Sequence, residues 1–337
     1  MAKIDIIMPL YNKASVVMRS VESIRRQTFD DWRLIVVDDG STDGSGDIVR
    51  EIADDRIEVI RQENAGPGGA RNVGIERATS EYIAFLDADD EWFDIYLENA
   101  LAGIEDSDAA IVGTMYYEWH KRQDMQRHWE KCGVIAGEYN LSGKERPEQA
   151  ENLMLFFHVG NSLVAAETAR KYGGFYAENN CRFAEDTTFF MRIVFNERVK
   201  IIGPVAVCHH REASNLSNTM KDPLAPFLAD SDVVLRYCPD EKLELMRAVL
   251  DRMAFRAVRK YARSGFKKDA VELLSKFPSL KTTQRQWRRC AFEIATSRWF
   301  KYWVGFKCAV GPRARLFLRK IARKVGLIQD SARSCDE

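Results

Sequence analysis

The chain has 337 residues, 46% of them hydrophobic, and its 50 basic residues balance its 50 acidic ones. This length suits two domains, or one large domain with an appendage. The sequence contains no signal-peptide layout and no apolar run long enough for a membrane-spanning helix, so we expect a cytoplasmic protein. Seven scattered cysteines without a CxxC pair argue against a disulfide framework, and their spacing argues against a zinc site.

The charge is unevenly distributed along the chain. Residues 240–337 contain 24 Lys+Arg and 10 Asp+Glu, whereas residues 1–239 contain 26 and 40. Such an asymmetry predicts two parts with different partners. We expect one domain over residues 1–225 and a basic helical domain over residues 226–337.

The first third of the chain alternates short apolar runs with amphipathic segments. The runs predict strands at 4–9, 33–39, 57–62, 82–87 and 109–117, and the segments between them predict helices at 16–27, 46–53, 68–78 and 95–105. Strands without clean alternation, separated by helices, indicate a parallel sheet covered on both faces. The later sequence predicts helices at about 230–238, 241–264, 266–276, 282–303 and 313–327.

Ligands of such sheets bind beyond the carboxyl ends of the strands, and these ends carry polar residues. The second strand ends in VVDDGSTDGS, where Asp38 and Asp39 precede a turn. Ser41, Thr42 or Asp43 could cap the next helix. The two carboxylates could equally accept hydrogen bonds from a nucleotide base or a ribose, so the motif fits both interpretations.

The segment NAGPGGARNVGI, residues 64–75, combines a glycine-rich turn, a helix start and Arg71. Its backbone N–H groups and its guanidinium could meet a phosphate. The segment lacks the GxGxxG and GK[ST] patterns, which disfavours a dinucleotide fold and a P-loop. An isolated loop of this kind is more often structural.

Four acidic residues, Asp87, Asp89, Asp90 and Glu91, crowd the end of the fourth predicted strand. Asp87 and Asp89 are two residues apart, so an extended chain points both side chains to the same side. Hard oxygen ligands at this spacing suit Mg²⁺ or Mn²⁺ held together with a diphosphate. Capping of the next helix requires one acidic residue, so the presence of four favours a metal.

Two further motifs follow after a long gap. FAEDTTFF places Glu185 and Asp186 at a predicted helix start, where a carboxylate either interacts with the helix dipole or serves as a general base. CHHREASNLS contains His209, His210 and Arg211, which could complete a metal shell, contact a phosphate or be structural. The residues alone leave both questions open.

Taken in order, the motifs resemble those of the inverting family 2 glycosyltransferases. The resemblance covers roughly the first 220 residues and is carried by PLYNKASVVMRSVESIRRQTFDDWRLIVVDDGSTDGS, NAGPGGARNVGI, EYIAFLDADDEW, GGFYAEN and AEDTTFFMR. It implies an α/β fold, namely a Rossmann-like GT-A (nucleotide-diphospho-sugar transferase) domain with a mainly parallel central sheet, followed here by a C-terminal α-helical region. It also implies Mg²⁺ or Mn²⁺ as cofactor and a nucleotide-sugar donor, most often a UDP-sugar.

The resemblance implies roles for individual residues. Asp186 matches the base that deprotonates the acceptor hydroxyl. Asp89 and Asp87 match the metal-binding DxD motif, and His210 is expected to join the metal shell. The residues expected to contact the sugar nucleotide are Pro9, Tyr11, Asn12, Asp38, Asp39, Arg71, Asp87, Asp89 and Arg211. A Tyr-Arg pair is commoner in the family where this chain has His210 and Arg211.

The segment RARLFLRKIARKVGLI lies outside the resemblance. It predicts a helix with one apolar and one basic face, and the aromatic segment RWFKYWVGF precedes it. Such a helix suits an anionic membrane surface, where it would bring the enzyme to a lipid-linked acceptor. Packing of the same helix on the catalytic domain is the alternative.

We therefore expect a metal-dependent inverting glycosyltransferase of surface polysaccharide synthesis, acting on a glycan or a lipid-linked acceptor. It would be cytoplasmic, and peripheral on the inner face of the membrane if its basic helices bind there; no nucleic acid is expected as a partner. One alternative is a sugar nucleotidyltransferase, whose glycine-rich N-terminal loop PLYNKAS does not supply. Another is a catalytically inactive sugar-nucleotide-binding module.

Overall fold

The structure is a computed structural model and describes residues 2–210 and 224–282. The chain divides into two units, Met1–Val249 and Leu250–Glu337, so the first unit reaches past the boundary expected at residue 225. Arg211, the predicted helix at 313–327 and nearly all of that at 282–303 lie outside the described residues.

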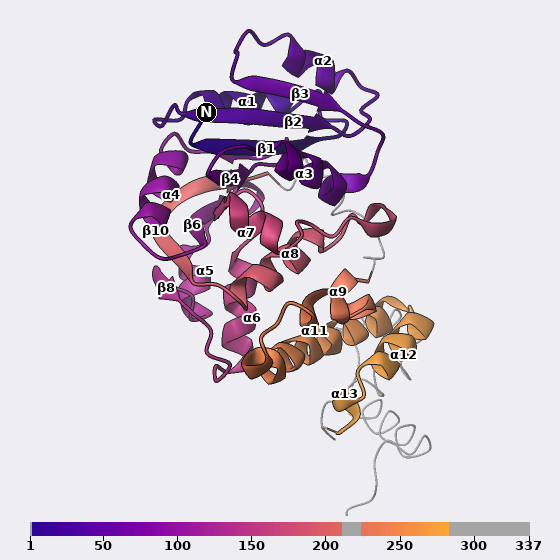
Figure 1. Ribbon diagram of the computed structural model, residues 1–337. Helices are drawn as coiled ribbons and strands as arrows, with labels where there is room; N and C mark the ends of the chain where they lie inside the picture. Colours follow the sequence, from indigo (N-terminus) through magenta and orange to yellow (C-terminus); the bar gives the residue numbers. More distant parts are fainter. Residues whose placement is uncertain (1, 211–223, 283–337) are drawn as a thin grey trace, which may run out of the picture. The chain divides into compact units, whose positions relative to one another are not determined.

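A ten-stranded sheet forms the centre of the first unit (Figure 1). Its strands are β1 (Ile4–Leu10), β2 (Trp32–Asp38), β3 (Ile57–Arg61), β4 (Tyr82–Phe85), β5 (Glu91–Trp92), β6 (Ile111–Glu118), β7 (Gln123–Asp124), β8 (Gly137–Tyr139), β9 (Ser162–Ala165) and β10 (Val199–His209). Their order is β3-β2-β1-β4-β9-β6-β10-β5, while β7 pairs with β6 and β8 with β10.

The sheet is parallel among the four strands predicted before residue 90, and β10, which the sequence does not predict, is a further parallel neighbour of β6. β1 pairs in parallel with β2 and β4, β2 with β3, and β6 with β10. β1 and β2 are buried along nearly their whole length, which explains why their residues do not alternate between apolar and polar. The antiparallel strand β9 lies between β4 and β6, and the two-residue strand β5 pairs antiparallel with β10.

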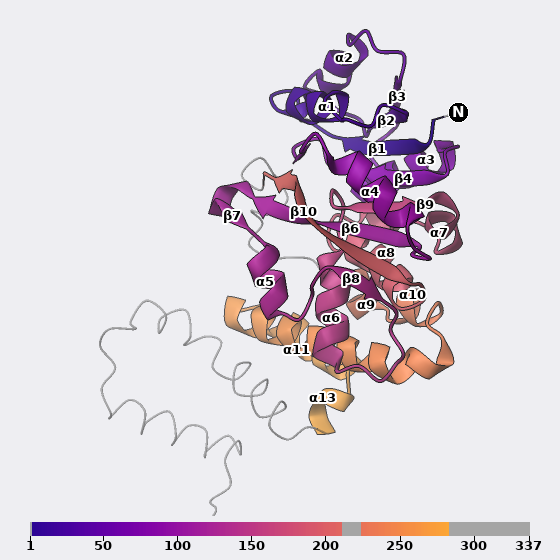
Figure 2. The same ribbon diagram turned by 90° about the vertical axis from the view of Figure 1, so that its left-hand side faces the viewer.

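Helices lie on both sides of the sheet, as Figures 1 and 2 show. Those of the first unit up to β10 are α1 (Val17–Arg25), α2 (Ser45–Arg50), α3 (Gly66–Arg77), α4 (Tyr96–Glu105), α5 (Gln126–Lys131), α6 (Pro147–Phe156), α7 (Ala166–Lys171) and α8 (Glu185–Val194), with the 3₁₀ turns Trp119–Lys121 and Glu178–Asn180. α3 packs on β1 and β2, whereas α4 packs on β6 and β10. A Cβ atom at Gly74 of α3 would collide with Ile7, so this glycine permits the close approach of α3 to β1.

Three phenylalanine rings form a buried cluster under the carboxyl end of β4. The ring of Phe175 lies 5.0 Å from that of Phe85, edge to face, and 4.5 Å from that of Phe189, stacked. Phe85 belongs to β4 and Phe189 to α8, so the cluster packs the sheet against the helix that begins with Glu185.

The remaining described elements are helical, as predicted. They are α9 (Pro226–Ala229), α10 (Asp232–Leu235), a 3₁₀ turn (Asp240–Lys242), α11 (Leu243–Ser264), α12 (Lys267–Lys276) and α13 (Ser279–Thr282). Ala270, Leu273 and Leu274 form the buried side of α12. Within residues 2–210 and 224–282, none of the helices is both long and apolar enough to span a bilayer.

Candidate active site

The carboxyl ends of β1, β2 and β4 meet at one edge of the sheet. Beyond the ends of β1 and β2, the N–H of Asp39 donates to the carbonyl oxygen of Leu10 at 2.8 Å. Pro9 is half-buried near the end of β1, where it lies opposite Val37 of β2. Tyr11 follows β1 and is 42% exposed, so its ring lies open to solvent at this edge.

Asn12 joins the loop after β1 to the loop after β2, and Asp38 supports the second of these loops. Asn12 adopts a positive φ of 53°; its Oδ1 accepts a hydrogen bond from Thr42 N at 2.8 Å and its N–H donates to Ser41 Oγ at 3.1 Å. Asp38 is fully buried and accepts from Ser41 N at 2.9 Å and from Arg61 Nη1 at 3.1 Å. Its carboxylate is therefore bound inside the protein, and a nucleotide contact for Asp38 remains a prediction.

Asp39 binds the start of α3. Its Oδ1 accepts hydrogen bonds from Ala65 N at 2.8 Å and Gln62 Nε2 at 2.7 Å, and its Oδ2 accepts from Gly66 N at 3.0 Å. These bonds satisfy N–H groups that a helix start leaves open. Asp39 thus serves the start of α3, while Asp43, one of the residues predicted to cap the next helix, accepts a hydrogen bond from Ser45 N at the start of α2, at 3.0 Å. Its contact with a base stays a prediction.

Arg71 of α3 is buried and lies between two carboxylates. Its Nη2 donates to Asp87 Oδ1 at 2.6 Å and its Nη1 donates to Glu185 Oε1 at 2.9 Å. The guanidinium also lies over the ring of Phe175, 5.1 Å from its centroid. Burial lowers the pKa of Arg71, but the charges of Asp87 and Glu185 outweigh burial and raise it overall, so the guanidinium stays charged. Arg71 therefore links the end of β4 to the start of α8.

The carboxylates of Asp87, Asp89 and Asp90 form an acidic cluster in the turn after β4. One oxygen atom from each lies within 4.8 Å of the others, and the turn is closed by a bond from Asp90 N to the Asp87 carbonyl oxygen at 3.0 Å. The donors are all carboxylate oxygens, which Mg²⁺ and Mn²⁺ prefer. The predicted pair of Asp87 and Asp89 is thus brought together, and its chemistry fits the expected cation.

Asp89 is the carboxylate of the acidic cluster whose pKa is raised by its surroundings. Burial, and after it the neighbouring carboxylates of Asp90 and Asp87, raise the pKa of Asp89 to about 6. The ammonium group of Lys13 opposes them from 2.6 Å. A bound divalent cation would stabilise the ionised form of this carboxylate further.

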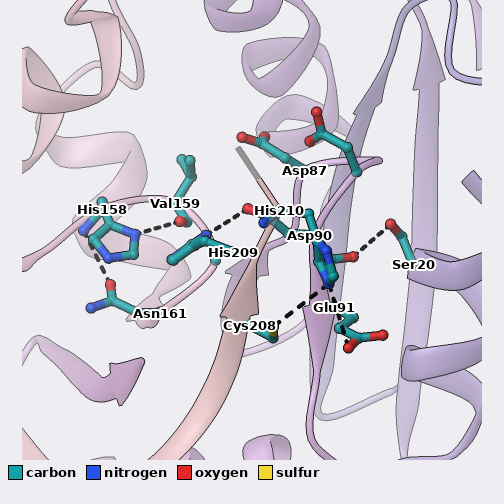
Figure 3. A network of polar contacts seen from close by, with 12 residues as sticks. Ser20, Asp87, Asp90, Glu91, His158, Val159, Asn161, Cys208, His209 and His210 are labelled. Atoms are coloured by element: carbon teal, nitrogen blue, oxygen red, sulfur yellow. Dashed lines mark hydrogen bonds and ion pairs between the residues drawn. The ribbon is translucent and has the colours of Figure 1, made fainter. Parts of the chain in front are cut away.

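Asp90 ties the acidic cluster to the end of β10 (Figure 3). Its Oδ2 lies 2.6 Å from His209 Nδ1, its Oδ1 accepts a hydrogen bond from His210 N at 2.7 Å, and its carbonyl oxygen accepts one from Ser20 Oγ at 2.6 Å. Burial raises the pKa of Asp90, but His209 and the His210 N–H outweigh burial, so the net shift is downward. Asp90 is therefore a structural anchor of the turn.

The ring of His210 lies apart from the predicted metal ligands Asp87 and Asp89. Its Nε2 groups with Glu91 and Cys208, not with the acidic cluster, and the ring lies 5.3 Å from that of Trp119. The reason is the pairing of β5 with β10, which sets Glu91 beside the end of β10. The backbone N–H of His210 reaches the acidic cluster through its hydrogen bond to Asp90.

The start of α8 separates the roles of Glu185 and Asp186. Ala184 precedes the helix with a φ of 58°, which turns the chain sharply at this point. Glu185 is buried against Arg71, and burial together with the charge of Asp186 raises the pKa of Glu185. Asp186 is only partly buried, and its Oδ1 accepts a hydrogen bond from Thr187 N at 2.6 Å. Of the two carboxylates, that of Asp186 is the one open to a substrate.

Sequence reasoning missed one contact of this site and left another open. Lys13 lies in the quoted PLYNKAS motif, yet the sequence does not indicate that it pairs with Asp89. For His209 the sequence left metal binding, phosphate contact and a structural role open, and its Nδ1 contacts Asp90. Both contacts depend on how distant loops meet, and the only signal in the sequence is an excess of acidic residues that must be neutralised nearby.

Solved structures define the class of fold. The structure of S. aureus TarS 1-349 in complex with UDP-GlcNAc superposes with a TM-score of 0.63 at 17% identity, covering 88% of this chain and 83% of that one. The mannosyltransferase PcManGT from Pyrobaculum calidifontis, in complex with GDP-Man and Mn²⁺, superposes with a TM-score of 0.52 at 18% identity, covering 88% and 87%. The fold is thus that of the GT-A glycosyltransferases, as predicted.

Sequence comparisons define the family. The profile described as glycosyl transferase family 2 matches residues 5–173. The succinoglycan biosynthesis protein ExoW of Rhizobium meliloti is 40% identical over 250 residues, which cover 68% of this chain and 75% of ExoW. The uncharacterized glycosyltransferase alr2836 of Nostoc is 42% identical over 118 residues, and the match spans 36% of its length. The chain therefore belongs to glycosyl transferase family 2.

Proposed function

We propose that this glycosyltransferase is metal-dependent and inverting, and that it moves a sugar from a UDP-sugar to a hydroxyl group of a glycan or lipid-linked acceptor. The observation that supports this most is the position of Arg71. By pairing with both Asp87 and Glu185, it brings the acidic cluster next to the start of α8, where Asp186 lies. A candidate cation site and a candidate base would thus share one edge of the sheet.

Asp89 and Asp87 would hold the Mg²⁺ or Mn²⁺ ion, since their oxygens converge. The bound ion supplies positive charge that stabilises the leaving nucleoside diphosphate. Pro9, Tyr11 and Asn12 would line the nucleotide pocket beside them, with Asp39 near the base.

Asp186 would take the proton of the acceptor hydroxyl as that oxygen attacks the anomeric carbon. The new carbon–oxygen bond forms on the face opposite the diphosphate, whose bond to the sugar breaks. A single displacement of this kind inverts the configuration and requires no carboxylate nucleophile. Glu185, held by Arg71, would keep the start of α8 in place.

Relatives support the choice of substrates. TarS forms a complex with UDP-GlcNAc, and PcManGT forms one with GDP-Man and Mn²⁺, which favours a nucleotide-sugar donor here. ExoW is named for succinoglycan biosynthesis, which favours a polysaccharide or its lipid-linked precursor as acceptor. Such synthesis would take place in the cytoplasm or at the inner face of the membrane.

Asp186→Asn tests the base. We expect the rate of nucleoside diphosphate release in the presence of acceptor to fall by about 10²–10⁴-fold, the usual contribution of a general base, while the calorimetric affinity for the donor nucleotide stays near that of the wild type. Asp232→Asn is the matched control, since Asp232 is an exposed carboxylate in the first turn of α10. Near-normal turnover by Asp186→Asn would refute the assignment. Pyrophosphate as the product would instead indicate a nucleotidyltransferase.

Asp89→Ala tests the cation site. We expect the gain in nucleotide affinity that Mn²⁺ produces in the wild type to fall by at least about tenfold, or about 1.4 kcal/mol, because the carboxylate that would ligate the ion is lost. Calorimetry of UDP binding with and without Mn²⁺ measures this gain. Asp108→Ala, which removes an exposed carboxylate, should leave it unchanged. An unaltered gain in Asp89→Ala would count against the site.

A further inference from the structure

Three atoms that can bind a metal ion, a sulfur, a nitrogen and an oxygen, lie close together at the end of β10. Cys208 lies directly opposite Glu91 in the antiparallel pairing of β10 with β5. His210 follows Cys208 by two residues, and residues two apart in an extended chain point to the same side. The pairing of the strands therefore gathers three side chains that are far apart in the sequence.

The distances among these donors are those of ligands around one ion. His210 Nε2 lies 3.5 Å from Cys208 Sγ and 3.5 Å from Glu91 Oε1, as the dashed lines of Figure 3 mark. All three donor atoms lie within 4.8 Å of one another. Ligands of a tetrahedral Zn²⁺, about 2.0–2.3 Å from the metal, lie roughly 3.3–3.6 Å from each other. A nitrogen–oxygen hydrogen bond is shorter, at roughly 2.7–3.2 Å.

Two of the three ligands, His210 and Cys208, are placed by the protein before any ion binds. The backbone of His210 is fixed by its hydrogen bond to Asp90 at 2.7 Å, and its ring lies against Trp119. Cys208 is 1% exposed, while the side chain of Glu91 is 23% exposed and leaves an approach from solvent. Rigid placement of this kind reduces the entropy that ligands lose when they bind a metal.

We propose that Glu91, Cys208 and His210 form a Zn²⁺ site that is distinct from the acidic cluster. Thiolate, imidazole and carboxylate are a typical zinc ligand set, whereas the acidic cluster offers oxygen alone and suits Mg²⁺ or Mn²⁺. On binding, the Cys208 thiol releases its proton to solvent and the neutral His210 ring ligates through Nε2. Water takes the fourth position. The ion pins the end of β10 to β5, next to Asp90.

Cobalt provides a direct test, because Co²⁺ replaces Zn²⁺ and reports a bound thiolate by an absorption band in the near ultraviolet. We expect the full-length, metal-free chain to develop this band with one equivalent of Co²⁺ and to lose it when Zn²⁺ is added. Cys208→Ser should abolish the band and weaken Zn²⁺ binding, measured by competition with a chromogenic chelator, at least about tenfold. Cys238→Ser, at another buried cysteine, should leave both unchanged.

Glu91→Gln provides a second variant at a partly exposed position, in case Cys208→Ser does not fold. It should keep the band but weaken Zn²⁺ binding in the same competition assay. Absence of a thiolate band in the wild type, or its persistence in Cys208→Ser, would overturn the proposal. Asp89→Ala should retain the band, so the test reads the zinc site separately from the proposed transferase activity.

Discussion

Lys13 and Asp89 form an ion pair at the position where a divalent cation is expected to bind. The ammonium group lies 2.6 Å from Asp89 Oδ2, and the two side chains are only 16% and 13% exposed. Charges so poorly exposed to water interact strongly, because solvent screening is weak. The ammonium would therefore compete with a bound metal ion for the same carboxylate, and it would offer a positive charge to a diphosphate once that ion takes its place.

Lys13→Met should change metal and nucleotide binding in opposite directions. Without the competing ammonium, we expect the affinity of the nucleotide-free protein for Mn²⁺ to rise about tenfold, or about 1.4 kcal/mol, while the affinity for UDP in saturating Mn²⁺ falls. Calorimetric titrations with each ligand measure both effects. Lys171→Met removes an exposed lysine with an equally short ion pair, to Glu197, and should change neither. Weaker Mn²⁺ binding in Lys13→Met would contradict the competition.

At the scale of residues, the sequence predicts which residue types come together at the edge of the sheet. It does not predict which of their atoms remain available to bind a ligand. Asp38, Asp39 and Arg71 all lie at the predicted edge, yet their side chains are occupied by bonds within the protein. Glu185 and Asp186 are adjacent and chemically alike, and only the turn at the start of α8 makes one buried and the other open. Hydrogen-bond partners of this kind depend on side-chain geometry, which no spacing rule encodes.

At the scale of elements, Asp5 joins three segments of the sheet. Its carboxylate in β1 is fully buried and accepts hydrogen bonds from Arg33 of β2 at 2.7 and 3.1 Å. It also accepts bonds from the N–H groups of Thr79 and Ser80, just before β4, at 2.6 and 2.8 Å. One side chain thus fixes the amino end of the three central parallel strands.

Asp5→Ala should destabilise the protein by about 3 kcal/mol, since it leaves the partly exposed guanidinium of Arg33 and two N–H groups without their acceptor. Burial raises the pKa of Asp5, but Arg33 and the two N–H groups outweigh burial and lower it below the ordinary value of 3.8. The stability that the lowered pKa contributes is present above that value and is lost as the pH falls below it.

Urea unfolding at pH 7 and at pH 3 measures both effects. The wild type should lose more stability between the two pH values than Asp5→Ala, in which this titration is absent. Asp55→Ala, at an exposed position, should behave like the wild type. An equal acid sensitivity of Asp5→Ala and the wild type would show that Asp5 does not carry the effect.

The elements that the sequence predicts best are those whose signal is local. The strands before residue 90 and the helices between them appear within a few residues of their predicted bounds, because buried parallel strands are continuous apolar runs. β5 has only two residues, which is too short for a recognisable hydrophobic pattern in the sequence. It pairs with β10, whose residues lie far from it along the chain. The spacing of the cysteines along the chain argues against a zinc site, because it cannot show which residues distant strands bring together. The pairing of β5 with β10 sets Cys208 beside Glu91.

At the scale of the whole molecule, the sequence indicates two parts by their charge, and the described chain also forms two units. The boundary differs, at residue 225 from the sequence and at 249 from the structure. The sequence shows where the chain changes from mixed to helical structure. It does not show which of the helices after that point belong to the unit that contains the sheet. Membrane binding by the basic C-terminal helix remains a prediction outside the described residues.

The double ion pair of Arg71 has a consequence for the synthesis of the chain. A nascent polypeptide that ends before α8 already contains β1 to β4 and the three aspartates of the acidic cluster, but Arg71 then has Asp87 without Glu185. Since domains generally fold as units, and Asp90 is held by His209 and His210 at the end of β10, the acidic cluster reaches its final arrangement only after residue 210 has been made.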